Sequence, residues 1–419
     1  MPDSTRRDFL QAAAGSAGLA VTLLPHMVAA NSSPNSSSPN SSARNSAARN
    51  SSARNSSAPS PKPVTNPAAP SAAAPPQAEP QAPAFVRSPA PAQAAGEPKT
   101  QTPPAAQRPP IRRLGMIGLD TSHVPAFTRL FNKELADDPR LGGLRVVAGV
   151  KAGNPDFPLS RDRVDGFTRE IEQLGVQIVP DIATLLTQVD GVLLQSVDGN
   201  QHLEQARPVL EAGVPLFIDK PLAASLPHAQ EIARLADQHH VPWFTASSSR
   251  FTAGYPELRD NPDIGDILGC DTYSQSRAAP QHPDLFWYGI HGIDLLYSLL
   301  GAGCLRVTAL QTPYTEQVTG HWREGRVGCY RSIREQTGKT GLGATVFGKQ
   351  GIAHCNQYYD YSTLVLAIAR FFLQRQSPIP AAEMLEVVTF MAAAEESKRR
   401  GGTPVELAEV AAAAAAPPR

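Results

Sequence analysis

Apolar residues are spread unevenly along the chain. Residues 31–110 hold almost no large apolar side chain, whereas from Ile111 onward short apolar runs alternate with segments whose apolar positions recur at helical spacing. A segment without apolar side chains cannot offset the entropy that ordering its backbone costs. The pattern therefore predicts an unstructured stretch up to residue 110 and a folded part from Ile111 to about Leu407.

The first half of the folded part alternates between strand and helix patterns. Its short apolar runs are typical of strands buried on both faces, and segments of helical periodicity separate them. These runs lie at residues 114–118, 144–150, 176–179, 191–195, 214–218 and 242–246. Strands and helices in alternation form a parallel sheet with helices on both faces. We therefore expect residues 111–246 to form an α/β domain, a Rossmann-type doubly wound parallel sheet.

The pattern changes after residue 246. Alternating apolar and polar positions, typical of a sheet with one covered face, occur at residues 269–275, 305–311, 326–333, 343–347 and 352–358. Helical periodicity marks residues 289–300, 364–374 and 382–399. We expect residues 247–407 to form a second, α+β domain with a mostly antiparallel open sheet. The alanine- and proline-rich end, residues 408–419, is expected to be unstructured.

The N-terminus has the features of an export signal. Ser4-Thr5-Arg6-Arg7-Asp8-Phe9-Leu10 has the twin-arginine pattern, an apolar stretch follows, and Val28-Ala29-Ala30 offers the small residues that a signal peptidase prefers. We therefore expect residues 1–30 to direct the folded protein to the twin-arginine export machinery of a bacterium, and so to the periplasm. Residues 31–110 would then act as a disordered linker, with a span of roughly 50 Å for about 80 residues.

Overall charge argues against nucleic acid as a partner. The chain has 38 basic and 38 acidic residues, and the basic residues form no stripe or cluster. Proteins that bind nucleic acid carry a concentrated positive surface. We therefore expect a small-molecule ligand.

Two motifs of the folded part can carry chemistry. Asp219-Lys220-Pro221 follows the fifth apolar run, so Lys220 lies where a parallel strand ends and open α/β sheets bind their ligands. A partly desolvated ammonium can stabilise a developing alkoxide and can give up its proton. In the second motif His291 and Asp294 are three residues apart on a predicted helix, where the carboxylate can orient the imidazole ring.

The order and spacing of these motifs resemble the Gfo/Idh/MocA oxidoreductases, which act mostly on sugars and polyols. The resemblance also includes Val189-Asp190-Gly191-Val192, His202, Glu211-Ala212-Gly213-Val214-Pro215 and Ser249-Arg250-Phe251. It implies that Lys220 and His291 handle the proton of a substrate hydroxyl while hydride passes to or from NAD or NADP. Pro221 would fix the turn that aims the lysine, and an X-Pro sequence permits a cis peptide bond there. The resemblance also implies a homo-oligomer.

The glycine-rich turn of that family is altered in this chain. Family members bring the cofactor's pyrophosphate close to a G-x-G-x-x-G/A turn. Here the first glycine, Gly118, remains, but Asp120 and His123 stand at the second and third glycine positions; Gly115, in the apolar run before the turn, is a further candidate cofactor contact. A carboxylate within about 4 Å of a phosphate charge costs roughly 4 kcal/mol at an effective dielectric constant near 20. Asp120 therefore opposes cofactor binding unless its side chain turns away or is neutralised.

Other candidate cofactor contacts follow the neighbouring strands. Lys151 stands where the family has a ribose-binding acid, which favours NADP over NAD. The turn after the fourth run supplies Ser196 and His202, and the lysine motif adds Asp219 and Pro221. No metal ion is part of this interpretation.

Three alternatives remain open on the sequence alone. The same scaffold can support a hydrolase or lyase that acts on keto-glycosides, with Lys220, His291 and Asp120 as acid–base groups. It can also support a sugar-binding protein without catalysis. Finally, Asp120, His123, His202, His291 and Asp294 could converge as ligands of a divalent metal ion.

Overall fold

The computed structural model describes residues 110–276, 279, 281–334, 341–357 and 361–415. The predicted signal peptide, nearly all of the predicted linker and residues 416–419 lie outside the described residues. None of the helices in the described part is long and apolar enough to cross a lipid bilayer.

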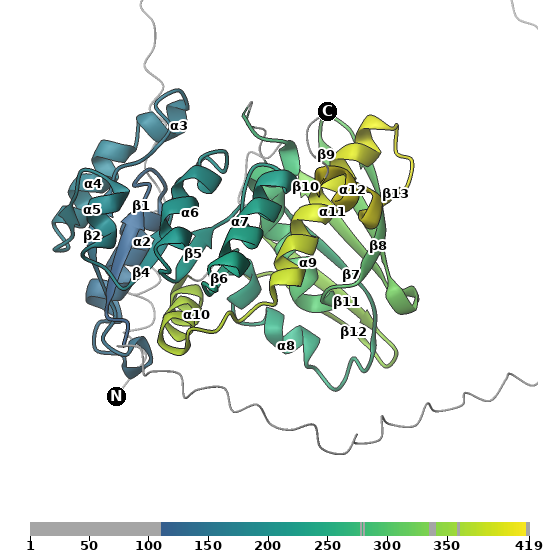
Figure 1. Cartoon of the computed structure of the whole chain (residues 1–419). Helices are drawn as coiled ribbons and strands as arrows, with labels where there is room; N and C mark the ends of the chain where they lie inside the picture. The colour runs from purple at the N-terminus through teal and green to yellow at the C-terminus, as the bar shows by residue number, and fades with distance from the viewer. Residues whose placement is uncertain (1–109, 277–278, 280, 335–340, 358–360, 416–419) are drawn as a thin grey trace, which may run out of the picture. The chain divides into compact units, whose positions relative to one another are not determined.

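A six-stranded parallel sheet forms the first half of the fold (Figure 1). Its strands are β1 (Arg113–Ile117), β2 (Arg145–Val150), β3 (Gln177–Ile178), β4 (Gly191–Leu194), β5 (Leu216–Asp219) and β6 (Trp243–Ala246). The order β3-β2-β1-β4-β5-β6 reverses direction between β1 and β4. In open α/β sheets such a reversal leaves a crevice at the carboxyl ends of the strands, where ligands bind. The predicted doubly wound Rossmann-type sheet is confirmed.

Helices bury this sheet. They are α2 (His123–Arg129), α4 (Val164–Glu172), α5 (Ile182–Leu186), α6 (His202–Glu211) and α7 (Leu226–Gln238). A further helix, α10 (Tyr361–Gln374), returns from the C-terminal half and lies beside the sheet in Figure 1. Its Phe371 contacts Phe244 of β6, which contacts Phe217 of β5, each with ring centroids 4.9 Å apart. Through these aromatic contacts, α10 from the C-terminal half packs against β5 and β6 of the first sheet.

The second sheet has seven strands in the order β12-β11-β7-β10-β9-β8-β13. They are β7 (Ile267–Gln275), β8 (Cys304–Gln311), β9 (Thr315–Trp322), β10 (Val327–Ile333), β11 (Gly343–Gly348), β12 (Ile352–Cys355) and β13 (Val405–Glu406). Only β10 and β7 run parallel within this described sheet. The predicted mostly antiparallel sheet is therefore confirmed.

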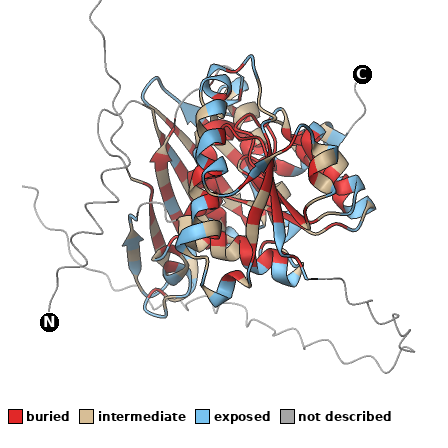
Figure 2. Ribbon diagram, turned by 90° about the vertical axis from the view of Figure 1, so that its left-hand side faces the viewer, coloured by how far each residue is buried: buried red, intermediate tan, exposed pale blue. Residues whose placement is uncertain are grey.

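Two long helices cover one face of the second sheet, α9 (Ile290–Leu300) and α11 (Ala381–Arg399). Figure 2 shows buried residues concentrated on the strands and on the inward faces of the helices. The remaining short elements are η1 (Leu130–Glu134), η2 (Pro139–Leu141), α3 (Pro158–Arg161), η3 (Ser248–Phe251), α8 (Tyr255–Arg259), η4 (Leu285–Gly289) and η5 (Arg323–Gly325).

The end of the chain differs from the expectation of an unstructured tail. Residues Leu407–Ala415 form helix α12. Alanine is the best helix former, and Leu407 is buried while Val410 packs against the core. An ion pair of 2.6 Å between Arg400 and Glu409 also links α12 to the end of α11. The alanine-rich composition reflects a packed helix in this segment.

Candidate active site

The lysine motif lies at the carboxyl end of β5, as predicted. The Lys220–Pro221 peptide bond is cis. Oδ1 of Asp219 accepts a hydrogen bond of 2.9 Å from the backbone N–H of Lys220. The half-buried side chain of Lys220 reaches the ring of Tyr288, whose centroid lies 5.8 Å from Nζ. Lys220 therefore leaves the sheet in a fixed direction, toward the loops of the C-terminal half.

His291 lies in the first turn of α9 and is buried. Its Nδ1 is 2.7 Å from Oγ of Ser247, and its ring contacts that of Tyr288. Burial, followed by the positive charge of Lys220, holds the pKa of His291 well below its ordinary value. His291 is therefore neutral near pH 7 and can accept a proton. The structure thus brings Lys220 and His291 into one site.

Asp294 supports this site in a different way from the one predicted. Its Oδ2 accepts a hydrogen bond of 2.7 Å from the backbone N–H of Ser247, and its Oδ1 accepts bonds of 3.0 and 2.8 Å from Arg250. The imidazole of His291 is bonded to the hydroxyl of Ser247. Asp294 thus positions Ser247, and Ser247 orients the ring.

Ser247 and Arg250 are functional residues that the sequence analysis did not assign. Arg250 also forms an ion pair of 2.6 Å with Glu383 of α11. In the sequence, Arg250 is marked only by the segment Ser249-Arg250-Phe251. This segment is part of the family resemblance, which assigns no role to the arginine.

The two glycines in and just after β1 serve close packing within the protein. Gly118 has a φ of 81°, and a Cβ there would lie 2.0 Å from Oγ of Ser196. Gly115 lies within β1, where a Cβ would lie 3.0 Å from the side chain of Leu185. Gly118 is therefore required where the loops after β1 and β4 meet, while Gly115 lies against helix α5 and away from the crevice.

The carboxylate of Asp120 is turned into the protein. Its Oδ2 accepts a hydrogen bond of 2.5 Å from the hydroxyl of Ser160, and its Oδ1 accepts one of 2.9 Å from the backbone N–H of Val197. Asp120 is fully buried, and burial is the main reason why its pKa is raised. The loops after β1, β2 and β4 therefore meet at this one side chain.

Residues 152–160, which follow β2, cover this end of the crevice; we call them the covering segment. The carbonyl of Ala152 accepts bonds of 2.9 Å from Ser196 and 3.0 Å from Gln205. Nδ2 of Asn154 donates a bond of 2.6 Å to Asp198. Phe157 packs on Trp287, with ring centroids 5.4 Å apart.

The other predicted cofactor contacts also have protein partners. Exposed Lys151 pairs with Asp165 at 2.8 Å. His202 is buried. Its Nε2 is 2.7 Å from the carbonyl oxygen of Ser196, and its Nδ1 is 3.2 Å from the carbonyl oxygen of Leu222. His202 thus links the loops after β4 and β5. These contacts correct the expectation that Ser196 and His202 present their polar atoms to a ligand.

The residues present fit a dinucleotide at one end only. At the nicotinamide end, Lys220 and neutral His291 suit a carbinol that loses a hydride and a proton. In Rossmann-type sheets the adenosine half of the dinucleotide lies between the loops after β1 and β2. In this protein the covering segment occupies that end and is hydrogen-bonded to the loop after β4. A dinucleotide in the usual pose therefore requires the covering segment to move.

We expect the double substitution Asn154→Ala and Phe157→Ala to tighten nucleotide binding about tenfold or more. A hydrogen bond contributes about 1 kcal/mol, and a ligand's apparent affinity falls with the fraction of protein in the binding-competent state. Loosening the covering segment raises that fraction. Isothermal titration of NAD and NADP measures the effect. Arg161→Ala is the control, since Arg161 is exposed and forms an ion pair with its neighbour Asp162. Equal affinities for all three proteins would show that the segment does not restrict the crevice.

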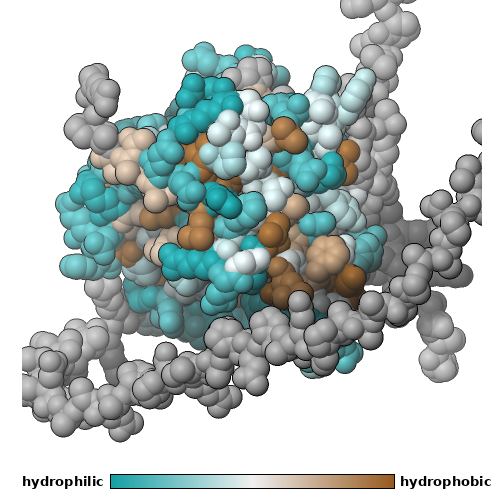
Figure 3. All heavy atoms as spheres, turned by 90° about the vertical axis from the view of Figure 1, so that its right-hand side faces the viewer, coloured by the Kyte–Doolittle hydropathy of each residue, from teal (hydrophilic) through white to brown (hydrophobic). Residues whose placement is uncertain are grey.

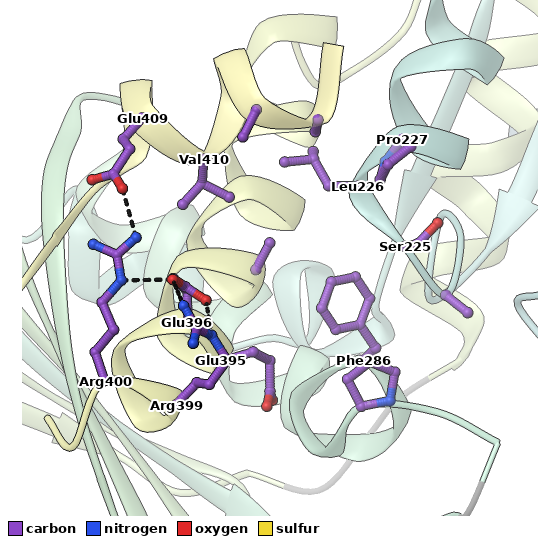
Figure 4. A pocket seen from close by; sticks show the side chains of 15 residues that line it. Ser225, Leu226, Pro227, Phe286, Glu395, Glu396, Arg399, Arg400, Glu409 and Val410 are labelled. Atoms are coloured by element: carbon purple, nitrogen blue, oxygen red, sulfur yellow. Dashed lines mark hydrogen bonds and ion pairs between the residues drawn. The ribbon is translucent and has the colours of Figure 1, made fainter. Parts of the chain in front are cut away.

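A separate cavity of about 510 Å³ lies between α7, α11 and α12 (Figure 4). Its walls are mostly apolar, with Leu226, Phe286 and Val410 among them. The charged side chains on its wall are paired, for example Arg400 with both Glu396 and Glu409. This cavity offers little to orient a polar substrate, so the carboxyl edge of the sheet remains the candidate site.

The metal alternative finds no support in the described part of the chain. There, no three histidine, cysteine, aspartate or glutamate side chains come together as ligands. Asp120 and His202, two of the five candidates, are engaged by the protein contacts given above.

The fold combines a Rossmann-type sheet with a second, mostly antiparallel sheet, and the site places Lys220 and His291 near the carboxyl edge of the first sheet. Residues 160–247 match the sequence profile of the oxidoreductase family with an NAD-binding Rossmann fold, the Gfo/Idh/MocA family. This match supports the resemblance inferred from the motifs.

Individual relatives point the same way. The chain is 28% identical over 88 residues to myo-inositol dehydrogenase Hyg17 of Streptomyces leeuwenhoekii. This alignment covers 21% of the chain and 27% of that relative. It is 25% identical over 157 residues to an uncharacterized oxidoreductase of Streptococcus pneumoniae, covering 36% and 42%. The chain thus matches less than half the length of these curated relatives.

Solved structures share the fold over a longer stretch. The scyllo-inositol dehydrogenase of Lactobacillus casei, solved with NAD(H) and scyllo-inositol, superposes with a TM-score of 0.57 at 18% identity. The similarity covers 72% of this chain and 100% of that one. At this identity the comparison establishes the fold.

Proposed function

We propose that this protein is an NAD(P)-linked oxidoreductase that acts on a hydroxyl group of a cyclitol or sugar. The observation that carries the proposal is that Lys220 and neutral His291 both lie against the ring of Tyr288, near the carboxyl end of β5. The family profile and the relative named as a myo-inositol dehydrogenase support it.

The chain's own residues account for the proton. The ammonium of Lys220 stabilises alkoxide character on the substrate oxygen, and neutral His291 accepts the hydroxyl proton. Ser247, held by Asp294, keeps the imidazole in place. The nicotinamide, when bound, supplies the hydride acceptor. Because the pKa of His291 lies well below 6.5, this base stays available at pH values where an ordinary histidine is protonated.

We propose NADP as the preferred cofactor. Lys151, at the end of β2, replaces the acid that would bind a ribose hydroxyl, and its ammonium suits a 2′-phosphate. Its ion pair with Asp165 is exposed, so it can exchange for a phosphate at little cost.

A second candidate function is nucleotide-independent hydrolysis or elimination of a keto-glycoside. The bonded covering segment favours it, because it fills one end of the crevice while leaving Lys220 and His291 in place. Asp120 is no longer an acid–base candidate for this reaction, since it is buried against Ser160 and Val197.

Turnover assays with the full chain separate the two functions. We expect nicotinamide absorbance to change when myo-inositol, scyllo-inositol or a related sugar is mixed with NADP or NAD. Product formation without nucleotide would favour the second function instead. A matching assay with chromogenic glycosides and no nucleotide completes the comparison.

Export and assembly form the remaining part of the proposal. The twin-arginine pattern supports export by the corresponding machinery, and cell fractionation after replacing Arg6 and Arg7 with lysine tests it. A homo-oligomer is proposed through the second sheet, which carries exposed apolar residues such as Leu310 and Ile352. On the side that Figure 3 faces, apolar and polar residues are interspersed. Analytical ultracentrifugation tests the assembly.

A further inference from the structure

A histidine and a carboxylate meet at the edge of the first sheet, next to Lys220. Nδ1 of His123 lies 2.7 Å from Oδ2 of Asp219, and both side chains are buried. His123 begins the helix after β1 and Asp219 ends β5, with β4 between these two strands. The pair therefore spans the carboxyl end of β4, within the region where open α/β sheets bind ligands.

The charge of Asp219 decides which ring nitrogen of His123 carries a proton. Burial acts to raise the pKa of Asp219, but His123 and Lys220 outweigh it and hold that pKa below its ordinary value. An ionised carboxylate only accepts hydrogen bonds, so Nδ1 of His123 is the donor. In the neutral ring, Nε2 then carries a lone pair and acts as an acceptor.

Nε2 of His123 has no hydrogen-bond partner among the described residues. The ring is otherwise held by apolar contacts, stacked on Phe127 at 5.1 Å and against the edge of Tyr361 at 4.9 Å. Its partner Asp219 lies close enough to His291 for the charge of the carboxylate to act on the pKa of that histidine. The two imidazoles therefore belong to the same site.

A buried amide without a partner lies beside this pair. Gln195 follows β4 directly and is fully buried, yet within the described residues neither its Nε2 nor its Oε1 has a hydrogen-bond partner. In the parallel pair of β4 and β5, Leu193 is the register partner of Phe217. Two residues further along each chain, Gln195 is therefore opposite Asp219. A buried polar group without a partner is costly and calls for a polar molecule to satisfy it.

Gln195 and Asp219 also share a face of the sheet. Residues two apart along a strand point to the same side. A Cβ at Gly191 of β4 would meet Phe372 of α10, and Phe217 of β5 reaches α10 through Phe244. The odd-numbered positions of both strands thus face α10, whose first residue, Tyr361, contacts His123.

We propose that His123, held in its acceptor tautomer by Asp219, forms with Gln195 a second polar subsite that binds a substrate hydroxyl next to the one that reacts at Lys220 and His291. A hydroxyl group can donate its hydrogen to Nε2 of His123 and accept one from the amide of Gln195. Polyols and cyclitols carry hydroxyls on adjacent carbons, so one substrate can reach both places. The proposal rests on the function proposed above.

The substitution Gln195→Leu tests the subsite. It removes an amide that lacks a partner in the free protein, so we expect thermal stability to be unchanged or higher. We also expect KM for myo-inositol to rise about tenfold with kcat little changed, which is the sign of lost binding in ground and transition states alike. His228→Leu is the matched control. Nδ1 of His228 is also buried without a hydrogen-bond partner among the described residues, but it lies in α7, outside the site. We expect that control to leave KM unchanged.

The position of the proton on the His123 ring is a second test of the subsite, and it does not depend on turnover. We expect nitrogen NMR of the full chain to find the proton fixed on Nδ1 of His123. In Asp219→Asn we expect both tautomers, because the amide can turn its oxygen or its nitrogen toward Nδ1. A wild-type ring protonated only on Nε2 would overturn the proposal.

Calorimetric titration of myo-inositol separates failure of the subsite from failure of the proposed function. If the protein shows no turnover with either nucleotide but Gln195→Leu still weakens inositol binding, the subsite stands and the oxidoreductase proposal fails. If turnover occurs and Gln195→Leu leaves KM and inositol affinity unchanged, the subsite is wrong and the oxidoreductase proposal stands.

Discussion

Replacing Lys220 with alanine is expected to lower kcat/KM for the cyclitol or sugar by about 10²- to 10⁴-fold. A positioned proton-transfer group contributes that much to catalysis, and Lys220 also supplies the positive charge beside the developing alkoxide. Steady-state kinetics that follow nicotinamide absorbance measure the loss.

Lys220→Arg separates the two roles of the lysine. Arginine keeps the charge but does not release a proton in proteins, so a partial rescue would indicate that charge dominates. Lys349→Ala is the control, because Lys349 is exposed and forms an ion pair with exposed Asp266. Full activity of Lys220→Ala would remove the lysine from the mechanism.

Replacing Arg250 with methionine is expected to destabilise the protein by about 3–5 kcal/mol. Arg250 is nearly buried and pairs with Asp294 at 2.8 Å and Glu383 at 2.6 Å. Removing one partner of a buried ion pair leaves charge uncompensated, and the cost of that is of this size. Denaturant unfolding of the full chain measures the change, with exposed Lys349→Met as the control that should leave stability unaltered.

The same substitution should also affect activity. Without Arg250, Asp294 loses two of the hydrogen bonds that hold it against Ser247, and Ser247 holds His291. A variant that unfolds like the wild type would show that water or rearrangement compensates both carboxylates.

The fold could be predicted because its signals are local. Short apolar runs such as Gly191–Leu194 are buried on both faces, and only a parallel sheet between helices provides that setting. Helix α12 was missed because its composition resembled the proline-rich tail, while its burial depends on distant partners such as Arg400.

The site could be predicted only in part. Lys220 and His291 sit in motifs of a few residues, so their positions follow from the chain itself. The contact between His123 and Asp219 joins residues 96 positions apart, and that between Asp120 and Val197 joins residues 77 apart. The sequence showed that a carboxylate and a histidine replace two glycines, but only the folded chain shows where they turn. Ser247 and Gln195 carried no motif of their own.

The central claim is that Lys220 and His291 support hydride transfer from a substrate carbon to a nicotinamide. The most direct test uses myo-inositol or scyllo-inositol with deuterium on its ring carbons, followed by mass spectrometry of the nicotinamide product. We expect the reduced nucleotide to gain one deuterium with the wild-type chain, and Lys220→Ala to form this deuterated nucleotide about 10²- to 10⁴-fold more slowly. Substrate conversion in which no deuterium reaches the nucleotide would contradict it.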